Sequence, residues 1–425
     1  MSSSAPRPAP PTPRIRTMDI ARGFAVMGIL LMNVIAFSMP EAAYLNPDAW
    51  GGRGGADRLT WALSFILFDG KMRGLFSLLF GASMLLLMDR TEMSGGDGRV
   101  RHIVRSFWLL LIGALHYLLI WWGDILSLYA VVGLIALLLA GKTPMQLVKF
   151  AFLAFFAEFV LLALKMLGIY RALSLTGTDP ERIGRMLDSM GRPESGAILQ
   201  EIALYRGGWI ETVAHKAADY VHWSVNGLEY MTLDTLGFML LGMAMLKGGF
   251  LTGAWQREQY LATARHCFVI AVPPMTALAI WCWASGFDTV TTFGAVFAWS
   301  FPFRIPLTVG WAALILAVAT RGKPGAFLTR VEAVGRMSLS NYLGTSIVMT
   351  AIFYGWGIGL FARVPRSEVY LFILPVWALM LSWSRLWLDR FVQGPLEWVW
   401  RTLTVGRPQP LLRRLGSVAA QTEQR

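Results

Sequence analysis

The sequence predicts an all-α protein: a polytopic transmembrane helix bundle of about ten spans, with both termini in the cytoplasm. Hydrophobic residues make up 55% of the 425 residues, and the mean hydropathy is +0.52. Apolar runs such as 103–122 and 145–170 are long enough to cross a bilayer core of about 30 Å as helices. A soluble chain of this length does not carry so much apolar sequence in such long runs.

Each long apolar run predicts one helical span. The first run has no small-x-small cleavage site after it, so we expect it to be retained as a helix and not removed as a signal peptide. The predicted spans are 18–38, 61–88, 103–122, 125–140, 145–169, 229–247, 262–284, 291–320, 334–361 and 368–388.

Lysine and arginine concentrate in alternate connections between these spans. The other connections (39–60, 171–228 and 285–290) are neutral or slightly acidic. Basic residues near span ends are retained on the cytoplasmic side, so this asymmetry predicts that both termini are cytoplasmic and that 171–228 is outside. The basic connections and tails carry Arg7, Arg14, Arg16, Arg90, Arg99, Arg101, Arg105, Lys142, Lys247, Arg257, Arg265, Arg321, Lys323, Arg330, Arg401, Arg407, Arg413 and Arg414.

The same pattern divides the chain into five parts. Residues 1–16 form a Ser/Pro/Ala-rich tail that we expect to be disordered in the cytoplasm. An N-terminal five-helix membrane half covers 17–170, and 171–228 is an extracytoplasmic insertion of short amphipathic helices. A C-terminal membrane domain covers 229–400, and 401–425 is a basic cytoplasmic tail.

The charge balance does not indicate nucleic-acid binding. The net charge is +12, but the basic residues follow the alternate loops and do not form one binding face. No CxxC or HExxH spacing is present, and His215 and His222 have no evident third ligand, so no metal is expected. Membrane lipids are the expected partners, nucleic acid is not, and the pattern is compatible with an oligomer.

Polar side chains recur at one depth inside the predicted spans. Charged groups in hydrocarbon are costly, so their positions mark candidate sites. Counted at about 1.5 Å per residue from the cytoplasmic span ends, six polar residues fall roughly 20–25 Å deep. This common depth predicts a buried polar cavity. The six are Asn33, Lys71, Arg73, His116, Glu158 and Arg304.

Two interpretations of this layer remain open. In one, Asp69 or Glu158 neutralises Lys71 or Arg73, and the layer is an internal network of ion pairs. In the other, the layer surrounds a cavity for an anionic or carbonyl-bearing group, with His116 as a general base near neutral pH.

Asp124 follows His116 by eight residues and also has two interpretations. A carboxylate can orient an imidazole and stabilise its protonated form, which would make Asp124 the partner of His116. Gly123-Asp124 is also an ordinary turn and N-cap signal for the next helix.

The first span carries a polar stripe. Asp19 and Arg22 are three residues apart and can pair on one helix face. Arg22 and Asn33 are eleven residues apart, about three full turns, so they share a face that runs from the cytosolic surface to the buried layer. Arg22 can alternatively act as a snorkelling anchor at the interface.

Several blocks of the chain resemble the YeiB-like membrane protein family. The blocks 18–33 (MDIARGFAVMGILLMN), 68–82 (FDGKMRGLFSLLFGA) and 116–126 (HYLLIWWGDIL) are similar to three family blocks. The blocks 335–342 (GRMSLSNY) and 394–398 (GPLEW) resemble its C-terminal domain of unknown function. The resemblance names a relative and not a reaction, and it implies a multi-pass protein of the bacterial cytoplasmic (inner) membrane.

The resemblance also implies a distant tie to transmembrane acyltransferases of the acyltransferase-3 and heparan-glucosaminide acetyltransferase type. In the acyltransferase-3 branch the first helix carries an Arg, ten residues and then a catalytic His. Arg22 matches that Arg, but Asn33 stands at the His position. Asparagine cannot serve as a base near neutral pH. Acyl transfer by that mechanism therefore needs another base, and His116 is the candidate.

These inferences define the candidate site. The catalytic candidates are His116, Asp124 and Asn33. The substrate-binding candidates are Asp19, Arg22, Lys71, Arg73, Arg304 and Asn341, the last of which lies in the C-terminal block.

Two functions of different classes fit these residues. The first is an acyltransferase that moves an acyl group from a cytosolic acyl-CoA to an acceptor at the membrane or outer face, with the Asn33 amide or Arg73 steadying the oxyanion. The second is a transporter or flippase for an anionic solute or lipid, bound by Lys71, Arg73 and Arg304. No clear repeat relates the two halves of the chain, which disfavours the common transporter folds. A purely structural membrane protein is the third option.

Overall fold

The computed structural model describes residues 14–175, 179–193, 195–322 and 325–413. The side chains of residue 189 and of 222–230, and with them the side chain of His222, lie outside the described residues. The expectations for the ends of the two tails, 1–13 and 414–425, lie outside the described residues as well.

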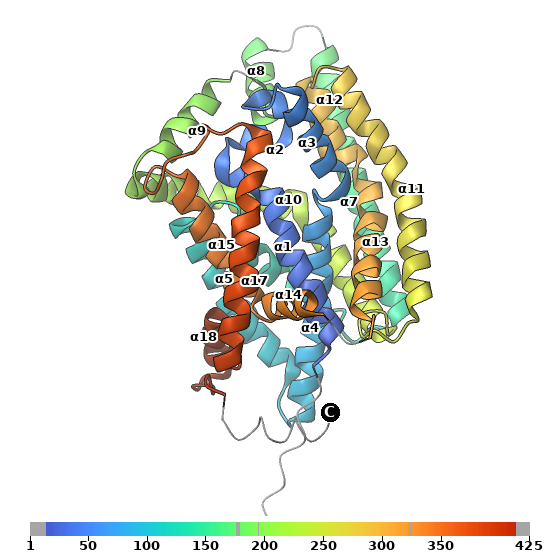
Figure 1. The fold of residues 1–425 in the computed structure, drawn as a ribbon. Helices are drawn as coiled ribbons and strands as arrows, with labels where there is room; N and C mark the ends of the chain where they lie inside the picture. The colour runs from blue at the N-terminus through green and yellow to red at the C-terminus, as the bar shows by residue number, and fades with distance from the viewer. Residues whose placement is uncertain (1–13, 176–178, 194, 323–324, 414–425) are drawn as a thin grey trace, which may run out of the picture.

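The described residues form an all-α bundle, as the sequence predicts, with a single isolated β-bridge between Phe391 and Leu412 (Figure 1). Three short helical turns, η1 (Pro47–Ala49), η2 (Ala295–Trp299) and η3 (Tyr370–Phe372), connect longer helices. The α-helices are α1 (Arg16–Ser38), α2 (Glu41–Leu45), α3 (Gly55–Leu67), α4 (Lys71–Met93), α5 (Gly98–Leu119), α6 (Leu126–Leu137), α7 (Pro144–Ser174), α8 (Pro180–Ser189), α9 (Gly196–Arg206), α10 (Trp209–Lys247), α11 (Arg257–Ala284), α12 (Thr289–Gly294), α13 (Phe301–Ala319), α14 (Ala326–Arg336), α15 (Ser338–Phe353), α16 (Arg366–Val369), α17 (Ile373–Arg390) and α18 (Pro395–Val405).

Seven helical segments in the described part of the chain are long and apolar enough to cross a membrane. Each coincides with a predicted span. The remaining three predicted spans are helical but do not belong to this set: 125–140 contains the 12-residue α6, 229–247 is the end of α10, and 334–361 is divided between α14 and α15. The seven segments are Arg16–Ser38, Gly55–Met93, Gly98–Leu119, Pro144–Ser174, Arg257–Ala284, Phe301–Ala319 and Arg366–Arg390.

Two predicted spans are broken helices. The span 61–88 divides into α3 and α4 at Gly70, whose φ of +74° is a left-handed conformation that side chains with a Cβ rarely adopt. The span 291–320 divides into α12, η2 and α13, and Pro302, which cannot donate a backbone hydrogen bond, lies in the first turn of α13. Apolar periodicity alone does not reveal these breaks, because the hydrophobic pattern runs through them.

Only the first part of the predicted insertion 171–228 is separate from the long helices of the bundle. The helices α8 and α9 lie in it, and α9 buries Ile198, Ile202 and Tyr205 on one face, as an amphipathic helix does. The helix α10, however, runs without a break from Trp209 across the expected boundary at 228. The second half of the insertion is therefore continuous with the bundle.

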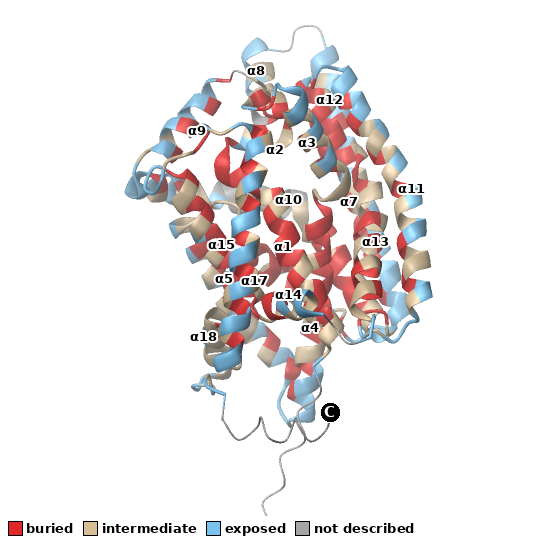
Figure 2. Cartoon of the chain, in the orientation of Figure 1, coloured by how far each residue is buried: buried red, intermediate tan, exposed pale blue. Residues whose placement is uncertain are grey.

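The helix α1 is the centre of the bundle. Of its most apolar stretch, 78% is buried, against 22% for α11 at the periphery. It packs against α4, α13, α14 and α15, and Figure 2 shows the buried residues concentrated around it. Because α1 is enclosed on several sides, its polar residues Asp19, Arg22 and Asn33 must meet other protein groups and not lipid.

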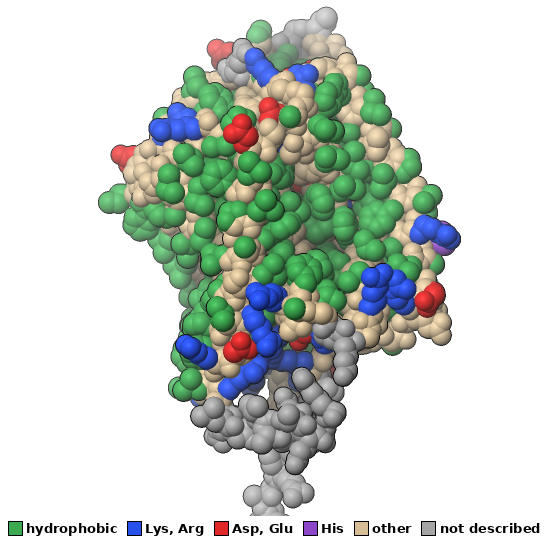
Figure 3. All heavy atoms as spheres, viewed as in Figure 1, with side chains coloured by type: hydrophobic (Ala, Val, Ile, Leu, Met, Phe, Trp, Pro, Cys, Tyr) green, Lys and Arg blue, Asp and Glu red, His purple; other side chains and the backbone are tan. Residues whose placement is uncertain are grey.

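Charged side chains gather at the ends of the bundle. Figure 3 shows a broad hydrophobic band around the middle of one face, with lysine and arginine concentrated at the end where α18 lies. We call this the basic end; α8 and α9 lie at the opposite end (Figure 1). Arg14 and Arg407, near the two ends of the described chain, line one cavity there, so both described ends of the chain are on the same side.

The arginine asymmetry predicts that the basic end faces the cytoplasm. We expect a cysteine at Gly196 to react with an impermeant maleimide in intact cells, and a cysteine at Gly141 to react only after lysis. Both glycines are exposed, and a Cβ at either meets nothing within 4 Å, so neither change disturbs packing. The two native cysteines, Cys267 and Cys282, are free thiols and are replaced first. Labelling of Gly196→Cys only after lysis contradicts this orientation.

Candidate functional site

A cavity of about 490 Å3 lies inside the bundle. Asn33 on α1, Arg73 on α4, Arg304 on α13 and Asp124 in the α5–α6 connection line it, together with Asp69. Most of its wall is hydrophobic, and we call it the apolar cavity. Its hydrophobic lining is Ile29, Met32, Ala36, Leu45, Leu110, Trp121, Trp122, Ile125, Leu128, Val131, Met231, Val296 and Phe297.

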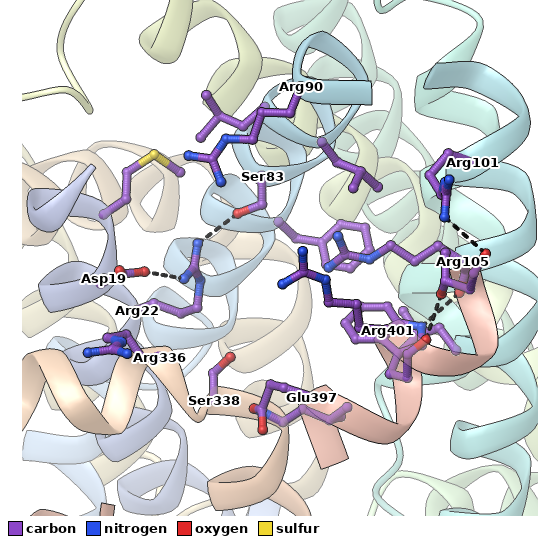
Figure 4. Close-up of a pocket in the computed structure, with 18 of the residues that line it drawn as sticks. Asp19, Arg22, Ser83, Arg90, Arg101, Arg105, Arg336, Ser338, Glu397 and Arg401 are labelled. Atoms are coloured by element: carbon purple, nitrogen blue, oxygen red, sulfur yellow. Dashed lines mark hydrogen bonds and ion pairs between the residues drawn. The ribbon is translucent and has the colours of Figure 1, made fainter. Parts of the chain in front are cut away.

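A second cavity of about 610 Å3 lies at the basic end (Figure 4). It is formed by α1, α4, α5, α6, α14, α15 and α18, and we call it the arginine cavity. Two acidic residues, Asp19 and Glu397, line it as well. Its eight arginines are Arg14, Arg22, Arg90, Arg101, Arg105, Arg336, Arg401 and Arg407.

Most of the positive charge in the arginine cavity is not neutralised within the described residues. Arg22 pairs with Asp19 at 2.7 Å and donates to Ser83 Oγ at 2.8 Å. Arg105 stacks over the Trp400 ring at 3.9 Å, and Arg101 donates to a backbone carbonyl. Of the eight arginines, Arg22 alone forms an ion pair with a described residue. A polyanion is the ligand that such a cavity favours.

Glu397 contributes little free negative charge to this cavity, because it caps α15. Its carboxylate accepts hydrogen bonds from the backbone N–H groups of Leu339 and Ser340 at 2.7 and 3.1 Å, and from Ser340 Oγ at 2.5 Å. The pKa of Glu397 is raised from its ordinary value, because desolvation outweighs the hydrogen bonds from Ser340 and Leu339 that lower it. The glutamate therefore joins α18 to the start of α15.

Tyr342 on α15 lines both cavities. Its hydroxyl donates to the Gly123 carbonyl at 3.2 Å, and its ring centroid lies 5.3 Å from that of His116. One aromatic side chain thus stands between the apolar cavity and the arginine cavity. Sequence reasoning missed Tyr342, although it belongs to the C-terminal block that resembles the YeiB-like family.

His116 and Asp124 form a buried pair beside Tyr342. His116 Nδ1 lies 2.9 Å from Asp124 Oδ1, and both side chains are 0% exposed. His116 Nε2 has no hydrogen-bond partner among the described residues. The imidazole itself lines neither cavity; it lies behind Tyr342, Trp121 and Asp124, which do. The imidazole is therefore separated from both cavities by a single layer of side chains.

Asp124 fulfils both roles that the sequence left open. Besides its bond to His116, it accepts hydrogen bonds from the backbone N–H groups of Leu126 and Ser127 at 3.2 and 2.9 Å, as a cap of α6. These N–H donors hold the carboxylate in place, and a fixed carboxylate fixes the imidazole tautomer with Nδ1 as the donor.

The partner of Arg73 differs from the sequence-based expectation. Arg73 pairs with Asp234 and donates to Thr235 Oγ1, both on α10. Asp69 and Glu158, the expected partners, do not pair with it: Asp69 accepts a hydrogen bond from Tyr44 at 2.5 Å, and Glu158 Oε2 has no hydrogen-bond partner among the described residues. Asp234 is an acidic residue within a predicted span, a signal that was present in the sequence.

Two of the predicted binding residues lie away from both cavities. Lys71 is fully buried, and its ammonium donates to the Phe65 carbonyl at 2.5 Å, where α3 ends. A cation at a helix C-terminus is favourable, so this lysine stabilises the break between α3 and α4. Asn341 bonds to Ser384, Trp383 and the Val334 carbonyl inside the protein. Both residues have structural partners and no contact with the cavities.

Arg304 is a cation of the apolar cavity that forms no direct ion pair with a described carboxylate. Its guanidinium donates to Ser300 Oγ and to the Val296 carbonyl, and it forms no ion pair with a described residue. It packs against Gly70, where a Cβ would approach its Cδ to 3.0 Å. The glycine therefore serves two purposes, since it permits the left-handed turn and leaves room for Arg304.

No group of three or more His, Cys, Asp and Glu side chains in the described part of the chain is placed to hold a metal ion. The polar chemistry at the cavities includes guanidinium groups, the carboxyl groups of Glu41 and Asp69, tyrosine hydroxyls, one His–Asp pair behind Tyr342 and the Asn33 amide. Asn33 is half-buried at the wall of the apolar cavity and makes no hydrogen bond with a described residue. Its amide is thus available to a ligand.

These features define an all-α bundle with seven helices suited to a membrane, an apolar cavity inside it and an arginine-lined cavity at one end. The chain belongs to the YeiB family: it is 33% identical over 410 residues to the uncharacterized protein YeiB of Escherichia coli, covering 94% of this chain and 98% of that protein. It is 29% identical over 416 residues to the uncharacterized protein YxaH of Bacillus subtilis, covering 94% and 96%. It is also 23% identical over 410 residues to an uncharacterized 39.9 kDa protein from Bacillus acidopullulyticus, covering 94% and 96%.

Residues 245–407 match a family model described as a protein of unknown function, DUF418. This region contains α13, α15 and α18 and therefore Arg304, Tyr342 and Glu397, but neither His116 nor Asp124. No solved structure matches the chain.

The Arg73–Asp234 pair yields a prediction about stability. Asp234→Asn leaves the buried guanidinium without its carboxylate, and we expect a loss of about 3–5 kcal/mol in the free energy of unfolding. The loss is measured as a lower thermal unfolding midpoint of the purified protein in detergent. The control is Glu181→Gln in the exposed Arg185–Glu181 pair, whose side chains are 70% and 81% exposed; no measurable change is expected there. Equal midpoints for the two variants contradict the prediction.

Proposed function

We propose that this chain is a membrane acyltransferase that moves an acyl group from a cytosolic acyl-CoA to an acceptor in the apolar cavity. The observation that carries the proposal is the arrangement at Tyr342. This residue lines the arginine cavity and the apolar cavity, and the His116–Asp124 pair lies directly behind it. A donor in one cavity and an acceptor in the other would meet beside a candidate general base.

The arginine cavity suits the nucleotide end of acyl-CoA. Coenzyme A carries a 3′-phosphate and a pyrophosphate, and arginine binds phosphate oxygens through paired N–H donors. Eight arginines line a cavity of about 610 Å3, and seven of them have no ion-pair partner among the described residues. With the phosphates held there, the narrow pantetheine arm would extend toward Tyr342 and carry the thioester to the boundary between the cavities.

In the proposed reaction, His116 Nε2 takes the proton from an acceptor hydroxyl. The hydroxyl oxygen attacks the thioester carbonyl carbon, a tetrahedral intermediate forms, and its collapse breaks the C–S bond. The departing CoA thiolate takes the proton back from His116. Asp124 holds Nδ1–H and stabilises the imidazolium while the proton resides on the ring. The Asn33 amide is the candidate donor to the oxyanion.

This assignment accounts for the departure from the acyltransferase-3 pattern. Asn33 replaces the catalytic histidine of that branch and cannot act as a base. His116 supplies an imidazole from α5 instead, while Asn33 remains at the wall of the apolar cavity. The base would thus come from α5 and not from the first helix, which carries the catalytic histidine in the related branch.

Transport of an anionic solute or lipid is the second candidate. Arg304, which has no carboxylate partner among the described residues and lines the apolar cavity, favours it, as does the position of the two cavities on either side of Tyr342. Lys71, the other expected binding charge, bonds to the Phe65 carbonyl instead. In this scheme the His116–Asp124 pair has only a structural role.

His116→Gln separates the two candidate functions. As the loss of a general base, it should lower acyl transfer from acyl-CoA by a factor on the order of 10²–10⁴, measured with purified protein in nanodiscs. Asp124→Asn should cost less, because it orients the base without replacing it. The matched control is His102→Gln on the same helix: His102 is also buried, bonds to the Gly133 carbonyl and lines neither cavity. Unchanged transfer in His116→Gln, or solute flux that survives it and stops in Arg304→Ala, contradicts the acyltransferase proposal.

Substitutions in the arginine cavity should instead affect the donor. We expect Arg22→Ala and Arg401→Gln to raise KM for acyl-CoA by roughly tenfold to a hundredfold with little change in kcat, because each removes hydrogen bonds from a charged group to phosphate. Inhibition by adenosine 3′,5′-bisphosphate should weaken in parallel. Arg385→Gln, in an exposed pair with Asp389 on α17, serves as the control. A fall in kcat with KM unchanged would argue against a donor site here.

A further inference from the structure

The wall of the apolar cavity reaches the outer surface of the bundle at Leu110. This residue lines the cavity and is 38% exposed. It lies on α5, where only 33% of the most apolar stretch is buried, so this helix faces the surroundings of the bundle. In a bilayer the surroundings at mid-helix are lipid hydrocarbon. The cavity is thus continuous with the lipid-facing surface.

The remaining wall is suited to hydrocarbon. Trp122, Leu128 and Val131 belong to the connection before α6 and to α6 itself, and Met231 and Phe297 come from α10 and η2. A small water-soluble acceptor would leave such a wall without favourable contacts, whereas an alkyl chain buries its surface against it. The shape and chemistry of the wall favour a ligand that is partly hydrocarbon.

The polar side of the same cavity offers Arg304 to a negative charge. Arg304 lines it and forms no ion pair with a described residue, while Arg73 is already paired with Asp234. The acidic residues that also line the cavity are engaged or hard to ionise: Asp69 accepts a hydrogen bond from Tyr44, Asp124 bonds to His116, and burial raises the pKa of Glu41. A guanidinium in apolar surroundings gains strongly from an anion, since there is little water to screen it. Asn33 and Asp124 lie on the same wall, so the acidic head would sit near the proposed reacting groups.

We infer that the apolar cavity binds a membrane lipid with an anionic head group, which enters from the bilayer past Leu110. The head group lies at Arg304, and one chain lies against the hydrophobic wall while the rest of the lipid stays in the bilayer. A hydroxyl on the head group is the acyl acceptor; this last statement rests on the proposed function, whereas the binding of the lipid does not. The transfer would convert that hydroxyl to an ester and release coenzyme A as its thiol.

The binding is tested by photocrosslinking in nanodiscs that contain phosphatidylglycerol with a photoactivatable acyl chain. We expect Leu110→Trp to narrow the entrance and to lower crosslinking by about tenfold or more. Leu111→Trp is the matched control, because Leu111 is the adjacent residue on α5, is 42% exposed and does not line the cavity; it should crosslink as the unmodified protein does. Arg304→Gln should lower crosslinking and Arg304→Lys should restore part of it. If the Arg304 variants do not fold, the Leu110 and Leu111 pair decides the test alone.

The outcomes separate this inference from the proposed function. Crosslinking that depends on Leu110 and Arg304, together with transfer of a labelled acyl group to phosphatidylglycerol, supports both. The same crosslinking without any consumption of acyl-CoA supports lipid binding and overturns the acyltransferase. Equal crosslinking in Leu110→Trp and Leu111→Trp overturns the lipid site. Acyl transfer to a water-soluble acceptor that Leu110→Trp leaves unchanged overturns the lipid as the acyl acceptor, since the acceptor would then enter from water.

Discussion

The structure depends on how a helical bundle satisfies polar groups where water is absent. A charge or a free backbone carbonyl in hydrocarbon is costly unless the protein supplies a partner. The Arg73–Asp234 pair meets this requirement between α4 and α10, and so aligns two helices that lie far apart in the sequence. The pair neutralises Arg73, whereas the guanidinium of Arg304 forms no ion pair with a described residue and lines the apolar cavity.

The broken helices follow from the same requirement. The break at Gly70 frees carbonyls at the end of α3, and Lys71 and Trp311 donate to two of them, those of Phe65 and Leu67. The break before α13 frees the Val296 carbonyl, to which Arg304 donates. Irregular backbone is tolerated at such depth where protein side chains satisfy it or where it lines a cavity. Both conditions are met here, since Gly70 and Val296 lie at the wall of the apolar cavity.

The His116–Asp124 pair shows how one side chain can serve folding and chemistry together. The carboxylate that caps α6 also orients the imidazole, so the start of that helix and the tautomer of His116 are determined by the same group. The pair lies at the boundary of two cavities with opposite preferences, one for phosphate and one for hydrocarbon. A reaction between a nucleotide-linked donor and a lipid acceptor would need a phosphate-binding cavity on one side of the base and a hydrocarbon-binding cavity on the other.

The sequence by itself determined the all-α class, the positions of the seven helical segments that are suited to a membrane, and the family. It also indicated two contacts that depend on short spacings, Asp19 with Arg22 and His116 with Asp124. Helix periodicity and turn chemistry determine such local contacts, so they can be derived from residue order. Only the tertiary structure decided that Asp234 partners Arg73, that Lys71 and Asn341 lie away from the cavities, and that arginines from five helices share one cavity. These arrangements depend on how distant helices pack and where they break, and hydrophobic periodicity carries no information about either.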